Sequence, residues 1–382
     1  MVSPSRVSAY VFGLMPQTFL NPAIPPPLVL IDGKALMFRA FYAMPSLTRR
    51  APERIEGQPE EQEIGAVVGF CNTLLSQLQP PPPVLACPYA PTVVVAFDCA
   101  GPTFRDDLFS EYKAQRGEPP PALGPQFDLA YEACQAFGWT AVSAPGFEAD
   151  DIIATFAAAA GRGVGTGGSS GAGAKRGVVI VGQDKDFMQL VTDRCVLVDP
   201  ARKRMFGPAE VEEKFGVPPR LMADLQALAG DPTDNVPGIP GIGPKIAAEL
   251  LRSWGSLGSV LDAAQAMDPS NPKKPAIKQT KRRENLVAHR DDALLSRRLV
   301  TLNSQVPLER IRLYETGDDA VADSELLLEN EGRLARLLAP LPRTRDQVGA
   351  DPASLPLSSA VEFCRRNQMR ALEKAVRSKA VP

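Results

Sequence analysis

Residues Gly146–Phe156 read GFEADDIIATF, in which three carboxylates come directly before an apolar run. The run stays apolar where an exposed helix would carry polar residues, so it predicts a buried helix. Acidic residues stabilise a helix N-terminus, but a single one would be enough for that purpose. Glu148 and Asp151 lie three residues apart and share a face, with Asp150 beside them. Because like charges so close repel unless a cation lies between them, we interpret this stretch as half of a divalent-metal site.

Three short apolar runs elsewhere in the chain each end in acidic residues. They are Leu28–Ile31 before Asp32, Val93–Phe97 before Asp98, and Val178–Val181 before Asp184 and Asp186. Continuous apolar runs of this length are typical of central parallel strands, in which Asp itself is disfavoured. Ligands of open parallel sheets bind outside the carboxyl ends of the strands, so we expect these acids to share one crevice.

The composition excludes several kinds of active site. The chain has 382 residues, 44% apolar and 23% charged, which suits one large or two smaller globular domains. No apolar run approaches the roughly 20 residues of a membrane span, so no membrane partner is expected. The six cysteines form no C-x-x-C pair and His289 is the only histidine. This pattern disfavours zinc sites, disulfide frameworks and histidine-dependent nucleophiles, so the chemistry must depend on carboxylates.

A glycine-rich segment follows a predicted helix over residues 211–228. Residues 230–245 read GDPTDNVPGIPGIGPK, and a further helix is predicted over 246–254. Gly241 and Gly243 before a helix N-terminus would leave backbone N–H groups exposed for a phosphate, and Lys245 adds positive charge. Two further acids, Asp231 and Asp234, precede the glycines. The net charge of −2 does not exclude nucleic acid, because it hides such local sites.

The segment 103–127 lies between the second and third predicted strands and carries basic and aromatic residues. Because it comes directly after the acid that ends a strand, it is expected above the crevice. The four residues of interest there are Arg105, Tyr112, Lys113 and Arg116.

Together these stretches resemble the 5′-3′ exonuclease domain of bacterial DNA polymerase I, a member of the flap endonuclease superfamily. The matching stretches are LVLIDGKALMFRAFYA, VVVAFDCAGPTFRDDLFSEYKAQR, GFEADDIIA, GQDKDFMQL and GDPTDNVPGIPGIGPKIAAELL. They extend from Leu28 to about Leu261, and more loosely to about Leu308. The resemblance implies an α/β fold with a PIN-like, mainly parallel sheet flanked by helices. It also implies a helical arch over 103–127 and a helix-hairpin (helix-3-turn-helix) DNA-binding subdomain.

The resemblance further implies two divalent ions, Mg²⁺ or in its place Mn²⁺, held by nine acids. Those nearer one ion would be Asp32, Asp98, Glu148 and Asp150. Those nearer the other, partly through water, would be Asp151, Asp184, Asp186, Asp231 and Asp234. The arch residues Arg105, Tyr112, Lys113 and Arg116 would grip the scissile phosphate or the threaded 5′ strand. Contacts to the DNA backbone would come from Arg39, Gly238, Gly241, Gly243 and Lys245. A potassium ion would bind at Gly241–Gly243, which we call the glycine hairpin.

The chemistry of the acids agrees with this reading. Mg²⁺ prefers hard oxygen ligands, which accounts for a site of Asp and Glu without His or Cys. Two such ions would activate water and neutralise the leaving oxygen of a phosphodiester, while Lys113 and Arg116 would stabilise the charged transition state. We therefore predict a metal-dependent, structure-specific 5′ nuclease. It would act on DNA with a 5′ flap, nick or end, or on an RNA–DNA hybrid, in primer removal, replication and repair.

The expected organisation has four parts. They are a disordered tail or transit peptide (1–27), the catalytic α/β domain (28–210, with a disordered insertion at 161–176), a helix-hairpin-helix-type DNA-binding part (211–310) and a helical tail (311–382). A transit peptide would direct the protein to a plastid or mitochondrion, and a plain tail would leave it in the cytoplasm or nucleus. We expect a stand-alone monomer that works beside a separate DNA polymerase.

Three other functions are compared with the nuclease. A catalytically weak DNA-junction-binding protein of the same fold would lack one of the acids, and none is missing. A PIN-like RNA nuclease would lack the glycine hairpin together with Asp231 and Asp234, which are present. A nucleotide-binding Rossmann enzyme is disfavoured because no G-x-G-x-x-G follows the first strand.

Overall fold

The structure is a computed structural model that describes residues 27–50, 61–77, 89–90, 92–162, 176–199, 201–268, 271–314, 326–327, 341–342 and 357–378. The predicted N-terminal segment 1–27 and the insertion 161–176 therefore lie almost wholly outside the described residues. None of the described helices is long and apolar enough to cross a membrane.

An eight-stranded sheet lies at the centre of the molecule, in the order β13-β12-β6-β5-β1-β7-β8-β9. The five strands from β6 to β8 run parallel, and the strands at both edges are antiparallel to their neighbours. Their bounds are β1 Leu28–Asp32, β5 Thr92–Ala96, β6 Thr140–Ser143, β7 Val178–Val181, β8 Cys195–Asp199, β9 Arg204–Phe206, β12 Arg312–Leu313 and β13 Leu326–Leu327. The predicted α/β fold with a mainly parallel sheet is thus confirmed.

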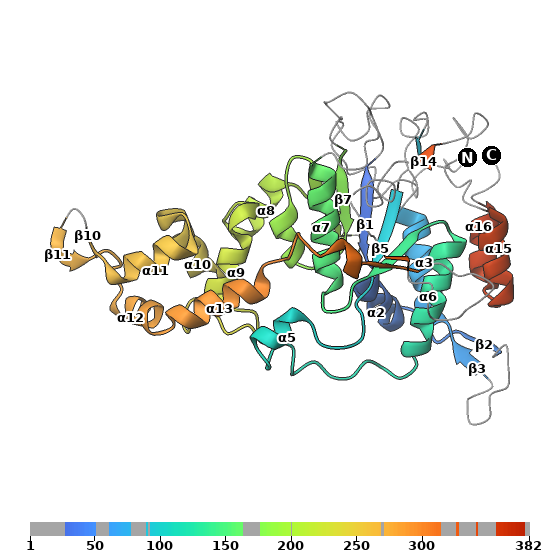
Figure 1. The fold of residues 1–382 in the computed structure, drawn as a ribbon, viewed down its shortest axis with the longest axis horizontal. Coiled ribbons are helices and arrows are strands. Elements are labelled where there is room, and N and C mark those ends of the chain that lie inside the picture. Colours follow the sequence, from blue (N-terminus) through green and yellow to red (C-terminus); the bar gives the residue numbers. More distant parts are fainter. Residues whose placement is uncertain are drawn as a thin grey trace, which may run out of the picture.

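Helices cover both faces of this sheet because its strands are apolar on both sides. Leu28 and Leu30 of β1 face the core beneath α7, whereas Val29 and Ile31 face the opposite core beneath α2, α3 and α6. Figure 1 shows α7 on one side and these other helices on the other side. The bounds are α2 Gly33–Ala43, α3 Gly65–Gln77, α6 Gly124–Ala136 and α7 Ala149–Gly161. Continuous apolar strands covered on both faces are what a central parallel sheet requires.

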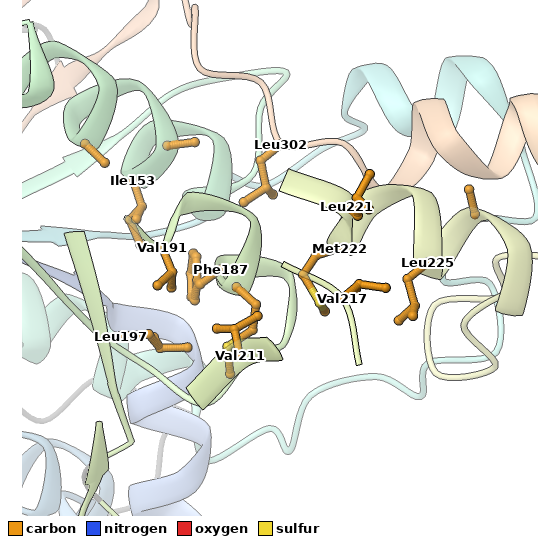
Figure 2. Close-up of a cluster of buried hydrophobic side chains, with 14 of the residues drawn as sticks. Ile153, Phe187, Val191, Leu197, Val211, Val217, Leu221, Met222, Leu225 and Leu302 are labelled. Atoms are coloured by element: carbon orange, nitrogen blue, oxygen red, sulfur yellow. The ribbon is translucent and has the colours of Figure 1, made fainter. Parts of the chain in front are cut away.

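The second half of the chain forms a helical arm that extends from the α7 side of the sheet (Figure 1). Its elements are α8 Pro208–Phe215, η3 Pro219–Leu221, α9 Met222–Ala229, α10 Pro244–Trp254, α11 Leu257–Gln265, β10 Met267–Asp268, β11 Asn271–Pro275, α12 Thr280–Ala288 and α13 Arg290–Val300. The arm shares one apolar core with the sheet. Figure 2 shows how Phe187 and Val211 lie between Leu197 of the sheet and Met222 of the arm.

Short elements complete the described structure. They are β2 Thr48–Arg50, β3 Glu61–Glu63, β4 Tyr89–Ala90, α5 Phe104–Leu108, the 3₁₀ helices η2 Asp186–Leu190 and η4 Leu308–Arg310, β14 Leu341–Pro342, α15 Leu357–Arg366 and α16 Arg370–Ser378.

The predicted helical arch over 103–127 is wrong in its conformation. Only α5 is helical before α6 begins at Gly124, and turns and extended backbone connect the two. The reason is local, because Gly117 and the three prolines at 119–121 cannot continue a helix. The arch segment, as we call residues 103–127, is therefore a strap rather than a helical bridge, and Figure 1 shows it passing below the sheet from α5 to α6.

The predicted helical tail over 311–382 also differs from the structure. It starts with β12, which pairs antiparallel with β6 and so extends the central sheet. Its end is not one helix but two, α15 and α16, which break at Gln368 with a positive φ of 56°. This pair packs on α6 and α3, and Phe363 and Leu372 belong to the core on that side of the sheet.

We expect the packing of α15 and α16 on α6 and α3 to contribute measurably to the free energy of unfolding. Phe363 is 2% exposed and meets Phe137 edge to face at 6.3 Å. Truncating such a side chain leaves a cavity, so Phe363→Ala should lower the free energy of unfolding by about 3–5 kcal/mol. Urea denaturation would measure the change. The exposed Arg370→Ala on α16 should stay within about 0.5 kcal/mol of wild type, and an equally small effect of Phe363→Ala would show that the pair does not dock on α6.

Candidate active site

The strand-end acids lie together at the carboxyl ends of the central strands, which we call the carboxyl edge of the sheet. The strands β5, β1 and β7 are neighbours and parallel, so their carboxyl ends meet there. Asp32 ends β1 and also caps α2 by accepting a hydrogen bond from the N–H of Ala35 at 2.9 Å. Asp98 and Asp184 follow the ends of β5 and β7 within a few residues. The sheet topology, and not proximity in sequence, brings these carboxylates together.

The N-terminus of α7 adds two more carboxylates to this edge. Glu148 is the residue that caps α7, and Asp150 lies in its first turn. The N–H of Ala149 donates a 2.7 Å hydrogen bond to Asp98, which fixes the start of α7 against the end of β5. Asp150 is close enough to the other acids that burial, together with the charges of Asp32, Asp184, Glu148 and Asp98, raises its pKa well above the usual value.

A third set of acids comes from the loops after β7 and α9. Asp186 begins η2 and accepts a hydrogen bond from the side-chain amide of Gln226. Asp231 and Asp234 flank a tight turn in which the N–H groups of Asp231 and Val236 each bond the other residue's carbonyl at 2.9 Å. These residues join the other two sets in what we call the acidic cluster, which consists of Asp32, Asp98, Glu148, Asp150, Asp184, Asp186, Asp231 and Asp234.

Burial and mutual repulsion set the electrostatics of the acidic cluster. Removal from water, together with the charges of Asp98 and Asp184, raises the pKa of Asp32 to about 7. Burial and the charge of Asp184 likewise raise the pKa of Asp186 to about 7. Burial would also raise the pKa of Asp98, but Lys34 and the N–H of Ala149 outweigh it and hold this pKa below its usual value. The cluster thus holds more negative charge than it can neutralise itself.

Five basic side chains offset part of this charge, and one of them is the buried Arg105, which lies 3.3 Å from Glu148. Lys34 lies 2.7 Å from Asp98, Lys113 lies 2.6 Å from Glu148, and Lys185 lies 2.9 Å from Asp231. Arg116 pairs with Asp234. Sequence reasoning missed Lys34 and Lys185 as members of the site. Their signal was visible, because each is the basic residue that comes directly among the strand-end acids in DGK and DKD.

The donor set fits a hard divalent cation, although the present side-chain positions do not form a finished cage. Every member is a carboxylate, the ligand that Mg²⁺ and Mn²⁺ prefer. Eight carboxylates face five basic side chains, so negative charge is in excess. Within the described part of the chain, however, no three acidic, cysteine or histidine side chains converge tightly enough to hold an ion. Lys34, Lys113, Lys185 and Arg116 instead pair with carboxylates of the cluster.

Asp151 does not belong to the acidic cluster, which corrects the prediction that it lies near a metal. Its side chain is fully buried and accepts two hydrogen bonds from Arg105, at 2.7 and 2.8 Å. The N–H groups of Asn303 and Glu148 occupy the same carboxylate at 2.8 and 3.2 Å. With both oxygens satisfied in this way, Asp151 locks the start of α7 to a distant loop.

Arg105 has a structural role for the same reason. It is 1% exposed, so it cannot reach a phosphate from this position as predicted. Besides Asp151, it donates to the carbonyl oxygens of Leu299 and Thr301 at the end of α13. Burial alone would lower the pKa of this guanidinium, but Asp151 and Glu148 raise it above the usual value, so the group stays charged. Arg105 therefore ties the sheet to the helical arm.

The remaining arch residues do lie at the acidic cluster. Tyr112 is 6% exposed, packs against Leu299 and Val300, and places its hydroxyl 3.4 Å from Glu148. Lys113 is partly exposed and bonds Glu148, and Arg116 is more exposed and bonds Asp234. Burial opposes the charged form of Lys113, but the charge of Glu148 outweighs it and raises the pKa of the ammonium group. Tyr112 thus anchors the segment, and the two cations border the acids.

Two residues with positive φ join the arch segment to the loop after α9. Lys113 has φ 55° and Asn235 has φ 56°, a conformation that costs about 1–3 kcal/mol for a residue other than glycine. The N–H of Lys113 donates to the carbonyl of Asp234 at 3.0 Å, and the Asn235 amide donates to the carbonyl of Glu111 at 2.8 Å. These reciprocal bonds offset the strain and hold Lys113 where its ammonium meets Glu148.

The predicted DNA-binding residues fall into three groups. Gly241, Gly243 and Lys245 are exposed, and Gly243 caps α10. Gly238 is buried, and a Cβ there would lie 2.3 Å from the backbone nitrogen of Gly230, so its role is close packing, not contact with a ligand. Arg39 is half-buried on α2, where burial lowers its pKa and the charge of Asp199 opposes that effect.

Two family profiles match the chain in succession. The first, described as 5′-3′ exonuclease, N-terminal resolvase-like domain, matches residues 27–216. The second, described as 5′-3′ exonuclease, C-terminal SAM fold, matches residues 217–317. These matches confirm the family resemblance predicted from the sequence.

Similar curated proteins are much longer than this chain. DNA polymerase I of Rhizobium leguminosarum is 45% identical over 282 residues, which are 74% of this chain and 25% of that protein. DNA polymerase I of Pseudomonas aeruginosa is 36% identical over 340 residues, 88% of this chain and 34% of that protein. The chain thus spans about a quarter to a third of the length of these relatives.

Two solved structures share the fold. T5 5′-exonuclease with bound zinc aligns with a TM-score of 0.52 and 24% identity, over 73% of this chain and 90% of that one. A complex of the bacteriophage T5 D15 flap endonuclease with DNA and metal ions aligns with a TM-score of 0.51 at the same identity and coverage. At this level of identity the likeness establishes the fold.

The different surroundings of Asp150 and Asp151 predict opposite effects on stability. Asp151→Ala removes the nearer, bidentate partner of the buried Arg105 and leaves it only Glu148 at 3.3 Å, so it should lower the free energy of unfolding by about 3–5 kcal/mol. Asp150→Ala removes one repelling charge and should leave stability unchanged or raise it. Both would be measured by urea denaturation in EDTA. Equal stability of the two variants would return Asp151 to the acidic cluster.

Proposed function

Because residues 27–317 belong to the 5′-3′ exonuclease family, we propose that this chain is a structure-specific 5′ nuclease. It hydrolyses phosphodiester bonds of DNA that carries a 5′ flap, nick or free 5′ end. The observation that carries this proposal is the acidic cluster at the carboxyl ends of β5, β1 and β7, bordered by Lys113 and Arg116. A cluster with excess negative charge beside partly exposed cations suits a polyanionic substrate that arrives with metal ions.

Two divalent ions, Mg²⁺ with Mn²⁺ as substitute, are the proposed cofactors. Asp32, Asp98, Glu148 and Asp150 would hold one of them, and the rest of the acidic cluster would hold the other. When bound, such ions lower the pKa of a coordinated water and neutralise the leaving oxygen of a phosphodiester. The excess of carboxylates over basic side chains and the raised pKa of Asp150 support this proposal, since both show charge that the protein leaves unpaired.

Lys113 and Arg116 would contact the reacting phosphate. Their side chains are 22% and 45% exposed, and both contact acids of the cluster. With divalent ions bound, Glu148 and Asp234 would be ligands of those ions, and the Lys113 ammonium and Arg116 guanidinium groups could bind phosphate oxygens. Placed at a site of developing negative charge, such groups stabilise the transition state more than the ground state. The docked backbone of Lys113 makes this group the better positioned of the two.

The glycine hairpin would bind the backbone of the DNA duplex at a second place, separate from the acidic cluster. Gly241 and Gly243 are exposed before the N-terminus of α10, and Lys245 lies in its first turn. The N–H groups of such a terminus bind phosphates without regard to base sequence. The Asn285 amide fixes this hairpin by donating to the Pro240 carbonyl at 2.7 Å. A potassium ion at the hairpin and action as a monomer are further parts of the proposal.

Asp150→Ala provides the direct test of the nuclease. With end-labelled 5′-flap DNA and Mg²⁺, wild type should release short 5′ products and should not do so in EDTA. Asp150→Ala should lower the rate by about 1,000-fold or more, because it removes a central carboxylate from a charge-dependent site. Asp262→Ala removes an exposed carboxylate from α11 and serves as the control. Wild-type protein that binds the flap with no cleavage would instead support the junction-binding alternative.

Lys113→Ala separates a catalytic role from a binding role. Single-turnover cleavage at saturating enzyme should slow by about 100-fold, whereas the dissociation constant for the flap should change less than threefold, because the contact matters most in the transition state. Lys374→Ala on α16 is the matched loss of an exposed lysine. An unchanged single-turnover rate would exclude Lys113 from the chemistry.

A further inference from the structure

Three basic side chains converge at the sheet edge formed by β9, outside the acidic cluster. Arg202 lies in the turn between β8 and β9, Arg204 begins β9, and Lys214 lies in the last turn of α8. The Arg204 guanidinium lies 5.0 Å from the ring centre of Phe206, and the Lys214 ammonium lies 4.7 Å from the same centre. Both cations thus lie within about 5 Å of one ring centre, and the charges of Arg202 and Arg204 act on Lys214.

The protein supplies little negative charge to this group, which we call the basic cluster. Asp199 is the acid beside it, and its Oδ1 accepts the N–H groups of Ala201 and Arg202 at 2.9 and 3.1 Å. Its Oδ2 meets the Arg202 guanidinium at 3.4 Å. Across the described residues, no carboxylate forms an ion pair with Arg204 or Lys214. Burial lowers the pKa of Lys214, the charges of Arg202 and Arg204 lower it further, and the charge of Asp199 opposes them.

The position of the basic cluster relates it to the proposed substrate path. β8 runs parallel to β7 with Val198 opposite Val181, so the turn that carries Arg202 leaves the sheet at the same edge as Asp184. The edge strand β9 lies two strand spacings, about 10 Å, from β7. The end of α8 also packs against α10, the helix that the glycine hairpin precedes. A Cβ added to Gly216, the residue that caps the C-terminal end of α8, would lie 3.3 Å from Ala248 of α10. Figure 1 shows α8 between β7 and α10.

We propose that Arg202, Arg204 and Lys214 bind the phosphate backbone of the DNA substrate between the acidic cluster and the glycine hairpin. This inference rests on the proposed function and adds to it a second, non-catalytic contact surface. Guanidinium groups hold phosphate oxygens in pairs, and a lysine adds a point charge. The surface is an exposed edge with Arg202 73% exposed, not an enclosed pocket, so it suits a continuous polyanion better than a small free anion.

The test compares two double variants that lose the same charge. Arg204→Gln/Lys214→Gln removes two of the three cations of the basic cluster. Arg370→Gln/Lys374→Gln removes one arginine and one lysine from α16, on the far side of α3 and α6. Single-turnover cleavage of 5′-flap DNA is measured against enzyme concentration at several salt concentrations. The first variant should need about tenfold more enzyme for half-maximal rate, with a maximal rate within twofold of wild type. Its log–log salt slope should fall by about 2, since each lost phosphate contact releases one counterion fewer. The control should match wild type.

Arg202→Gln guards against a folding defect, because it changes one exposed side chain in a turn and should reduce the salt slope by about 1. Half-maximal concentration and salt slope equal to wild type in both basic-cluster variants would overturn the inference and leave the nuclease proposal intact. Absence of cleavage by the wild-type protein would instead overturn the proposed function on which the inference rests.

Discussion

Repulsion among carboxylates gathered at one sheet edge is the constraint on which the rest of this structure depends. Parallel neighbouring strands deliver Asp32, Asp98 and Asp184 to the same place, and α7 adds Asp150 directly beside them. Removal from water makes that charge more costly and raises the pKa of several of these groups. The surrounding structure responds with lysines and arginines drawn from separate segments. The carboxylates that remain without a basic partner can bind cations.

A second charged pair, Arg105 with Asp151, supports that site from beside it, and Arg105 also lies 3.3 Å from Glu148 of the acidic cluster. Arg105 and Asp151 are buried together and bond the backbone at the end of α13, so one ion pair connects the arch segment, α7 and the helical arm. Its geometry satisfies every donor and acceptor that it removes from water, which is the condition under which a buried pair is tolerated. Lys113, despite its positive φ, is thereby held with its ammonium 2.6 Å from Glu148.

The charges outside the acidic cluster are also arranged by the fold. The basic cluster lies on the β9 edge, the glycine hairpin precedes α10, and both are on the side of the molecule where the arm meets the sheet. On the opposite side, α15 and α16 cover α3 and α6 and extend the apolar core beyond residue 317, where the family profiles end.

The sequence alone determined the three central strands β1, β5 and β7, the acids at their ends and the glycine hairpin, because each follows from a local pattern with a fixed geometric consequence. Strand-end residues of parallel neighbours must meet, whatever the rest of the chain does. The tertiary structure decided which side chains face which partner. Asp150 and Asp151 are adjacent and chemically identical, yet one lies among repelling acids and the other pairs with Arg105, 46 positions away. Spacing along the chain records direction around a helix, but only packing of remote segments supplies the partner.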